Sequence, residues 1–503
     1  MSEQVDTYKP GQEPSDSLLV RWLPTRHRTR ERALVLKLDL LLLSWAFVAG
    51  LTKDMDQSAT TQAYVSGMKE ALHLDGNQLV EFTTYFSIGY ALCIIPSQLI
   101  QTKIRSSLFL PICEIIWGAL TLATYASKNA KTIYALRFFL GMFESTSWPG
   151  LVALIFNWYK PAELGKRVAI FGVSGVAGSM FLGILQAALY KNLNGAAGLA
   201  GWQWLFIVSG LITMFWGALG LLIVPDSPSN TRALWLTPDE RKLAYDRIAA
   251  KNIAPAKLVS KSYLWTRIKA TARSPLSWLF TTAYLQFAWS QRANSYFLLY
   301  LKGLTRADGS KLYSTYKVNL LPLGGYALSI VFNIGLNAIS DRFRWRLQIS
   351  VLAATIQLVA CSVLSAWPSS TPAIMTFYYI TFTTAAWGYA LIAWLAEILK
   401  REPESRALLI GVVVTLTYVG HATIPLRAWR VADSPRYPIG FPLATAFAAG
   451  GILNLFAIWW WVRRHPELEE HGFGGEAEEI GYEGDRKAAE ADEEFGHDSK
   501  VRA

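Results

Sequence analysis

The chain has 503 residues, of which 52% are hydrophobic by type and only 17% are charged, whereas a soluble domain carries about a quarter charged residues. Its apolar residues come in blocks of roughly 20 to 27, the length that a helix needs to cross a bilayer core, so the sequence predicts an all-α polytopic membrane protein. The formal net charge of +11 is spread over the loops between these blocks, which argues against a nucleic-acid-binding protein.

The N-terminal segment is polar and basic, and it lacks the apolar core of a cleaved signal peptide. We therefore expect residues 1–37 to be cytoplasmic and the first membrane helix to direct insertion. The three cysteines, Cys93, Cys113 and Cys361, all lie inside apolar blocks, so the sequence offers neither a disulfide framework nor a metal cluster. No cofactor and no metal are expected.

Apolar blocks of spanning length fall into two groups of six, separated by a long polar segment. The first group predicts helices over residues 38–64, 79–100, 108–126, 133–159, 168–190 and 202–224. The second predicts helices over residues 276–301, 318–339, 347–367, 373–399, 407–429 and 439–462. The expected fold is therefore two six-helix bundles, over 38–224 and 276–462.

The charges of the loops indicate on which side of the membrane each loop lies. The polar segment 225–275 begins with Pro/Ser turns and continues as a basic, amphipathic helix, which predicts a cytoplasmic loop at the membrane surface. Assigned to sides by alternation, Lys and Arg number about 34 on the side of both termini and about 12 on the other, so both termini are expected in the cytoplasm. The tail over 463–503 is rich in Glu, Gly, Ala and Asp, and is predicted to be disordered.

Two halves of six helices suggest an internal duplication, and such repeats place a substrate site near the bilayer midplane between the halves. The turns after the second and eighth helices, PSQLIQTKIRSS and GLNAISDRFRWR, both carry basic residues. In the latter turn, Asp341 and Arg342 are candidates for a gating loop; a solvated loop pair is the alternative. The glycines of GVSGVAGSMFLG in the fifth helix indicate close helix packing, since a dinucleotide-binding loop would need a preceding soluble strand.

Ionisable side chains inside the predicted spans need an explanation. Each costs about 2.5 to 3.5 kcal/mol at a helix centre, so it requires a partner, a water-filled cavity or a function. The candidates are Glu81, Glu114, Arg137, Glu144, Arg292 and Glu397, with Asp54 and Asp56 placed toward the outer part of the first helix. We interpret Glu114 and Glu397 as structural.

Arg137 and Glu144 on the fourth helix are the strongest functional candidates. Seven residues is close to two helical turns, so both side chains project from one face of an otherwise apolar helix. A fixed cation and a titratable carboxylate facing one cavity can couple a proton to an anion, because protonation changes the field that the substrate feels. A structural ion pair between helices is the alternative.

Further candidates for substrate contact lie on other helices. Arg292 in the seventh helix is a second cation that could bind a carboxylate, or its side chain could snorkel to the membrane interface. Aromatic side chains such as Tyr85 could line a cavity for an amphipathic solute; packing and the interface belt are the alternatives. The six histidines do not pair at ligand spacing, which argues against a membrane metalloenzyme.

Several stretches carry a family likeness, among them DQSATTQAYVSGMKEAL, ALRFFLGMFESTSWPGLVALIFNWYKPAELGKR and VPDSPSNTRALWLTPDER. They resemble the fungal anion:cation symporter (allantoate permease) branch of the major facilitator superfamily, and AYVSGMKE with RFFLGMFES is most similar to the pantothenate and vitamin permeases. Asp341 and Arg342 are similar to that superfamily's loop signature. The resemblance implies proton-coupled uptake of a small monocarboxylate across the plasma membrane.

The resemblance also implies roles for particular residues. In distant relatives an Arg and a Glu seven apart on the fourth helix take part in coupling, which maps onto Arg137 and Glu144. On the first helix it makes Asp56 a candidate for proton coupling and Gln57 a candidate for substrate binding. The chain departs from the pattern at Gln57, where many members have Arg, and at Ala59, where these permeases often have Asn.

Together these features favour a secondary transporter that carries protons and a small organic anion, with pantothenate first among the candidates. We expect it to work as a monomer in the bilayer. Uptake of nicotinate, biotin or allantoate and export of an acidic metabolite are alternatives. A non-transporting nutrient sensor is a different class of protein, and the short, plain tail argues against it. We predict no enzymatic activity.

Overall fold

A computed structural model describes residues 30–101, 103–249, 261–306, 308–399 and 402–466. Within these ranges the regular structure is helical, and the only β-type contact is an isolated bridge between Thr305 and Lys311. The predictions for the first 29 residues and for the tail from residue 467 onward lie outside the described residues.

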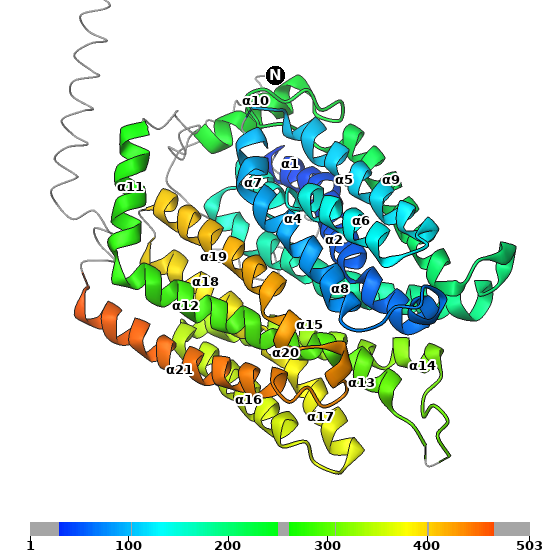
Figure 1. The fold of residues 1–503 in the computed structure, drawn as a ribbon. Helices are drawn as coiled ribbons and strands as arrows, with labels where there is room; N and C mark the ends of the chain where they lie inside the picture. The colour runs from blue at the N-terminus through cyan, green and yellow to red at the C-terminus, as the bar shows by residue number, and fades with distance from the viewer. Residues whose placement is uncertain (1–29, 102, 250–260, 307, 400–401, 467–503) are drawn as a thin grey trace, which may run out of the picture.

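The first half of the chain forms a bundle of helices, coloured blue to teal in Figure 1. Its α-helices are α1 (Arg30–Leu38), α2 (Ser44–Ala63), α3 (Lys69–Ala71), α4 (Gln78–Gln101), α5 (Ser106–Ala123), α6 (Ala130–Glu144), α7 (Ser147–Trp158), α8 (Pro161–Leu193) and α9 (Gly201–Ile223). They are joined by the π-helical turns η1 (Asp39–Leu43) and η2 (Tyr64–Met68) and the 3₁₀ turns η3 (Thr124–Ala126) and η4 (Ala196–Gly198).

The second half forms another bundle, coloured green to red, and two helices of the polar segment precede it. These two are α10 (Pro238–Ala249) and α11 (Lys261–Arg273). The bundle consists of α12 (Pro275–Ser290), α13 (Phe297–Gly303), α14 (Thr315–Leu320), α15 (Pro322–Phe343), α16 (Arg346–Ala366), α17 (Thr371–Thr381), α18 (Ala386–Ile398), α19 (Pro403–Thr423), α20 (Pro425–Ala428) and α21 (Gly440–Arg464), with the 3₁₀ turns η5 (Gln291–Tyr296), η6 (Phe382–Thr384) and η7 (Val431–Asp433).

Ten helical stretches of the described residues, some with a short kink, are long and apolar enough to cross a membrane. The two other predicted spans, 276–301 and 373–399, are each divided by a 3₁₀ turn: the first into α12, η5 and α13, the second into α17, η6 and α18. The first crossing runs from Arg30 to Ala71, past the predicted end at residue 64. Asp54 and Asp56 therefore lie near its middle and not toward its outer end.

Helices α4 and α6 touch through their backbones. A Cβ atom at Gly89 would lie 2.1 Å from the carbonyl oxygen of Phe138, and one at Gly141 would lie 2.1 Å from that of Phe86. Side-chain atoms do not fit at such distances, so only glycine allows this approach. The contact fixes the position of α6 against α4.

Polar contacts between the two bundles gather at the end away from the polar segment. Lys302 Nζ donates to Glu70 Oε1 at 2.9 Å and to the Tyr64 carbonyl at 3.2 Å. Asn77 Nδ2 donates to the Leu426 carbonyl at 3.0 Å, and Thr84 Oγ1 donates to the Ala422 carbonyl at 3.0 Å. In Figure 1 this is the region where α13, α14 and α20 approach the blue helices. These bonds close that end of the molecule.

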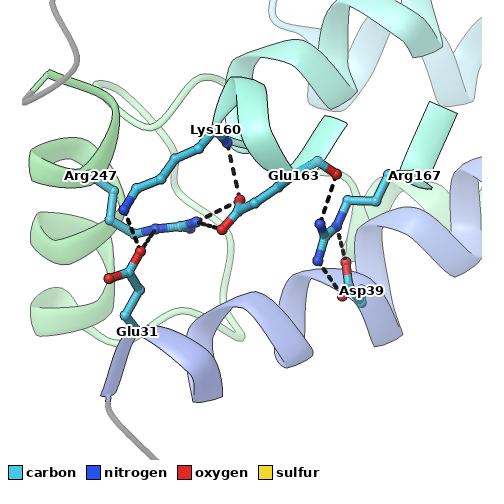
Figure 2. A network of polar contacts seen from close by, with 6 residues as sticks. All are labelled: Glu31, Asp39, Lys160, Glu163, Arg167 and Arg247. Carbon is cyan, nitrogen blue, oxygen red and sulfur yellow. Dashed lines mark hydrogen bonds and ion pairs between the residues drawn. The ribbon is translucent and has the colours of Figure 1, made fainter. Parts of the chain in front are cut away.

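At the opposite end, an ionic network joins α1, α8 and α10, as Figure 2 shows. Arg247 of α10 donates to Glu31 Oε1 at 2.9 Å and to both oxygens of Glu163 at 2.8 Å. Lys160 Nζ also contacts Glu31, at 2.5 Å, and Arg167 binds both oxygens of Asp39 at 2.6 and 2.7 Å. The network attaches α10, which belongs to the polar segment, to the first bundle.

A second ionic contact supports the same attachment. Lys37 of α1 lies 2.9 Å from Glu240 of α10, and the Thr237 amide also donates to Glu240 at 2.9 Å. Burial alone would raise the pKa of Glu240, but the hydrogen bonds from Thr237 and Lys37 outweigh it and lower the pKa below its usual range. Glu240 therefore holds α10 at neutral pH, and this contribution is lost as the pH falls through the lowered pKa.

Candidate functional site

Lys53, near the middle of the first crossing, is the centre of a charged cluster. Its side chain is buried, and its Nζ donates to Gln57 Oε1 at 3.0 Å, one turn further along α2. The same Nζ lies 3.6 Å from Asp54 Oδ1 and 3.9 Å from Glu144 Oε1. One cation thus faces two carboxylates inside the membrane-spanning part of the protein.

The start and the length of helix α6 determine where Glu144 lies. Asn129 caps the helix, because its side chain accepts a hydrogen bond from the Thr132 amide at 2.9 Å. Four turns later Glu144 is the last residue of α6, and a short break precedes α7. Its side chain is fully buried, and neither carboxylate oxygen accepts a hydrogen bond from a described residue. An ionised carboxylate in this place depends on Lys53 for compensation.

Arg137, two turns before Glu144, takes different partners. Its guanidinium donates to the backbone carbonyls of Asp56 at 3.2 Å and Gln57 at 2.9 Å. The side chain is 6% exposed and lies 5.7 Å from the ring centroid of Phe86. These bonds hold α6 against the middle of α2, so the arginine positions the cluster without forming a direct ion pair with Glu144.

Two more carboxylates lie behind the cluster, inside the first bundle. Asp56 Oδ2 accepts a hydrogen bond from Thr213 of α9 at 2.8 Å, and Glu114 Oε1 of α5 accepts one from Thr52 at 3.1 Å. Asp56 is 1% exposed and Glu114 is fully buried. Asp54, in contrast, has a side chain that is 32% exposed. The first crossing therefore turns Asp54 toward accessible space and Asp56 toward the interior.

The second bundle contributes polar aromatic groups to the same place. Tyr418 of α19 stacks on Tyr90 of α4, with ring centroids 3.8 Å apart, and it lies within electrostatic range of Lys53. Tyr389 of α18 faces Asp54 and Lys53 in the same way. Lys53 and its carboxylates consequently lie where the two bundles meet.

Arg292 lies on η5, the 3₁₀ turn that divides the seventh predicted span. It interacts with Tyr296 and lies within electrostatic range of His421, and its Nε has no hydrogen-bond partner among the described residues. The break in the helix places this cation beside α19. Neither Glu144 nor Asp54 forms an ion pair with it.

The remaining predicted residues lie outside the cluster. Tyr85 is 41% exposed and stacks on Tyr134, whose hydroxyl donates to Glu81. Asp341, at the end of α15, pairs with Arg346, which in turn lies 2.7 Å from Glu397, all within the second bundle. Arg342 is exposed beside it. The structure thus brings together Gln57, Arg137 and Glu144, with Asp56 behind them. Arg292, Tyr85, Asp341 and Arg342 lie apart from this cluster.

Sequence reasoning missed Lys53, although it lies in the first predicted span. The signal was present, because a lysine in TKDMDQ stands one residue before Asp54 and one turn before Gln57. The surface groove between α12 and α21 is a different feature. It is lined by mostly apolar residues, among them Trp278 and Trp460, and it contains none of the predicted site residues.

Comparison with known proteins is consistent with this architecture. The chain is 32% identical over 426 residues to the MFS transporter PfmaC of Pestalotiopsis fici, covering 83% of this chain and 78% of that one. It is 28% identical to the pantothenate transporter liz1 of Schizosaccharomyces pombe, covering 84% and 80%. A solved D-xylose-proton symporter has the same fold, with a TM-score of 0.60, 15% identity, and coverage of 84% of this chain and 97% of that one.

The family model described as Major Facilitator Superfamily matches residues 46–425. With the pantothenate transporter among the relatives, the likeness that the sequence suggested is confirmed. The all-helical fold and the multi-pass membrane character are confirmed as well. The chain belongs to the Major Facilitator Superfamily and is a membrane transporter, not an enzyme.

Proposed function

We propose that this transporter is a symporter of protons and a small organic anion, with pantothenate first among the candidate substrates. The observation that carries the proposal is Glu144, a buried carboxylate without a hydrogen bond from a described residue and 3.9 Å from Lys53. A buried carboxylate that depends on one cation for compensation changes its protonation state when that cation takes another partner, which is what coupling a proton to an anion requires. The relative from Schizosaccharomyces pombe, named a pantothenate transporter, supports the choice of substrate.

Membrane energetics explain why a proton should accompany the anion. A monoanion that enters a cell against an inside-negative potential is opposed by about 2.3 kcal/mol for each 100 mV. One proton per anion makes the transported charge zero and removes this opposition. The inward gradient of protons can then drive accumulation.

The remaining features of the proposal concern placement. We propose a plasma-membrane protein that works as a monomer, with both termini and the segment 225–275 in the cytoplasm. In that orientation the hydrogen bonds of Lys302, Asn77 and Thr84 lie at the outer end and hold the two bundles together there. Nicotinate, biotin and allantoate are the alternative substrates, and export of an acidic metabolite is the alternative direction.

Uptake of labelled pantothenate tests the proposal. Cells that lack their own pantothenate permease and express this chain should accumulate the label several-fold more at pH 5 than at pH 7. A protonophore should abolish accumulation, because it removes the proton gradient. Nicotinate and biotin at the same concentration serve as comparison substrates. Absence of uptake of all three, with the protein verified at the plasma membrane, would contradict import of these anions and favour an exporter or a sensor.

A further inference from the structure

Among the described residues, three cations near the centre of the molecule could bind a substrate carboxylate: Lys53, Arg137 and Arg292. Arg137 is committed to the carbonyls of Asp56 and Gln57, and a substrate could reach it only by breaking the contact between α6 and α2. Arg292 lies beside Tyr296 and His421, without an ion pair to a described carboxylate. Lys53 differs from both, because carboxylates already lie beside its Nζ at distances longer than a hydrogen bond.

We propose that Lys53 binds the carboxylate of the transported anion and that the anion displaces Glu144 from it. The inference rests on the proposed function and deepens it. Lys53 hydrogen-bonds only Gln57 among the described residues, at 3.0 Å, and keeps Asp54 and Glu144 at 3.6 and 3.9 Å. An ammonium group has three N–H donors, so Lys53 can donate a hydrogen bond to a substrate carboxylate and keep its hydrogen bond to Gln57.

Competition for this one cation links the substrate to the proton. Once a substrate carboxylate occupies Lys53, Glu144 loses its nearest compensating charge inside a buried site, and protonation becomes the favourable way to neutralise it. The site then gains one negative charge with the anion and one positive charge with the proton. The net charge of the site is the same when it is empty and when it is loaded. The transporter can therefore expose the site to either face of the membrane in both states.

The groups that face Lys53 come from both bundles. They are Asp54 and Gln57 of α2, Glu144 of α6, Tyr418 and His421 of α19 and Tyr389 of α18. Glu144 is also within electrostatic range of Asp54 and Asp56 of α2, Arg137 of α6 and Tyr90 of α4. The tyrosines and Gln57 offer hydrogen bonds to neutral polar atoms next to the bound carboxylate. This arrangement favours monocarboxylates that carry hydroxyl or amide groups close to the acid, a description that pantothenate meets. A dicarboxylate would leave one charge without a cation at Lys53.

The test measures binding of pantothenate to the purified full-length protein by calorimetry at pH 5.5 and pH 7.5, in two buffers of different ionisation enthalpy. The wild type should take up about one proton for each anion bound. Lys53→Gln should weaken binding about 100-fold at both pH values, the scale of a lost charge-assisted contact. Lys53→Arg should restore binding to within about tenfold of the wild type.

Two further variants separate the steps. Glu144→Gln should bind pantothenate without proton uptake and with no pH dependence, because the competing charge is absent. Lys37→Gln is the matched control, since this lysine lies on the same helical run but pairs with Glu240; its affinity should equal that of the wild type.

Three results would overturn parts of this account. Binding to Lys53→Gln within about threefold of the wild type would remove Lys53 from the substrate site while leaving the proposed function intact. Loss of binding in Arg292→Gln together with normal binding in Lys53→Gln would assign the carboxylate to Arg292. A wild type that binds none of pantothenate, nicotinate and biotin would contradict the proposed function itself.

Discussion

Glu144 and Arg137 project from one helix but have different partners, and this difference predicts different roles. Glu144 faces Lys53 without a hydrogen bond from a described residue, so its loss should affect coupling and not assembly. We expect Glu144→Gln to exchange pantothenate across the membrane, to accumulate none, and to show equal uptake at pH 5 and pH 7. Glu81→Gln, a carboxylate bonded to Tyr134, is the control and should keep the acid stimulation. Undiminished acid stimulation in Glu144→Gln would exclude Glu144 as the proton site.

The position of helix α10 depends on a few ion pairs between side chains. Arg247 is 95% buried and bridges Glu31 and Glu163, so Arg247→Ala leaves two carboxylates close together without their shared cation. A fully buried pair costs about 3 to 5 kcal/mol to break, and partial exposure of both glutamates reduces this to roughly 2 kcal/mol. We expect a lower unfolding temperature in detergent and faster proteolysis within α10. Arg430→Ala, which breaks an exposed pair with Asp433, should change neither; equal effects would show that α10 is held by other contacts.

The whole molecule can alternate only if the contacts between the bundles open. Thr84 and Ala422 are bonded across the end that we propose to be outer, so a disulfide between cysteines at these positions should hold that end closed. We expect oxidation of the Thr84→Cys, Ala422→Cys double variant to lower uptake at least tenfold, and reduction to restore it. The single variants Thr84→Cys and Ala422→Cys, which cannot form this disulfide, are the controls and should keep their uptake under the same oxidation. Full uptake by the cross-linked double variant would mean that this contact does not open.

Much of the fold could be predicted because the bilayer restricts the choices. A block of apolar residues in lipid has to form its backbone hydrogen bonds internally, so block length alone identifies the helices. The breaks at η5 and η6 could not be predicted in this way, since QRANSY and FTT are tolerated only where neighbouring helices satisfy the exposed backbone groups. The boundaries of the two bundles at 224 and 276 stay a prediction.

Which residues of the candidate site share a face of one helix could be predicted from the sequence, but their partners on other helices could not. The spacing of Arg137 and Glu144 indicates that they share a face of α6, and the structure buries both. Their partners come from α2, and the partners of Arg137 are backbone carbonyls, which leave no trace in the residue pattern. Tyr85 and Tyr90 are equally aromatic in the sequence, yet only Tyr90 reaches Tyr418, because side-chain direction depends on how α4 is rotated.

The glycine contact between α4 and α6 also limits how the protein can move. With Gly89 and Gly141 each pressed against a carbonyl of the other helix, neither helix can slide or roll on its neighbour without collision. Helix α4 carries Thr84 and Tyr90, which touch the second bundle, and α6 carries Glu144. A tilt of α6 at Glu144 therefore has to move α4 as well, so the proposed proton site and the contacts of α4 with the second bundle are mechanically linked.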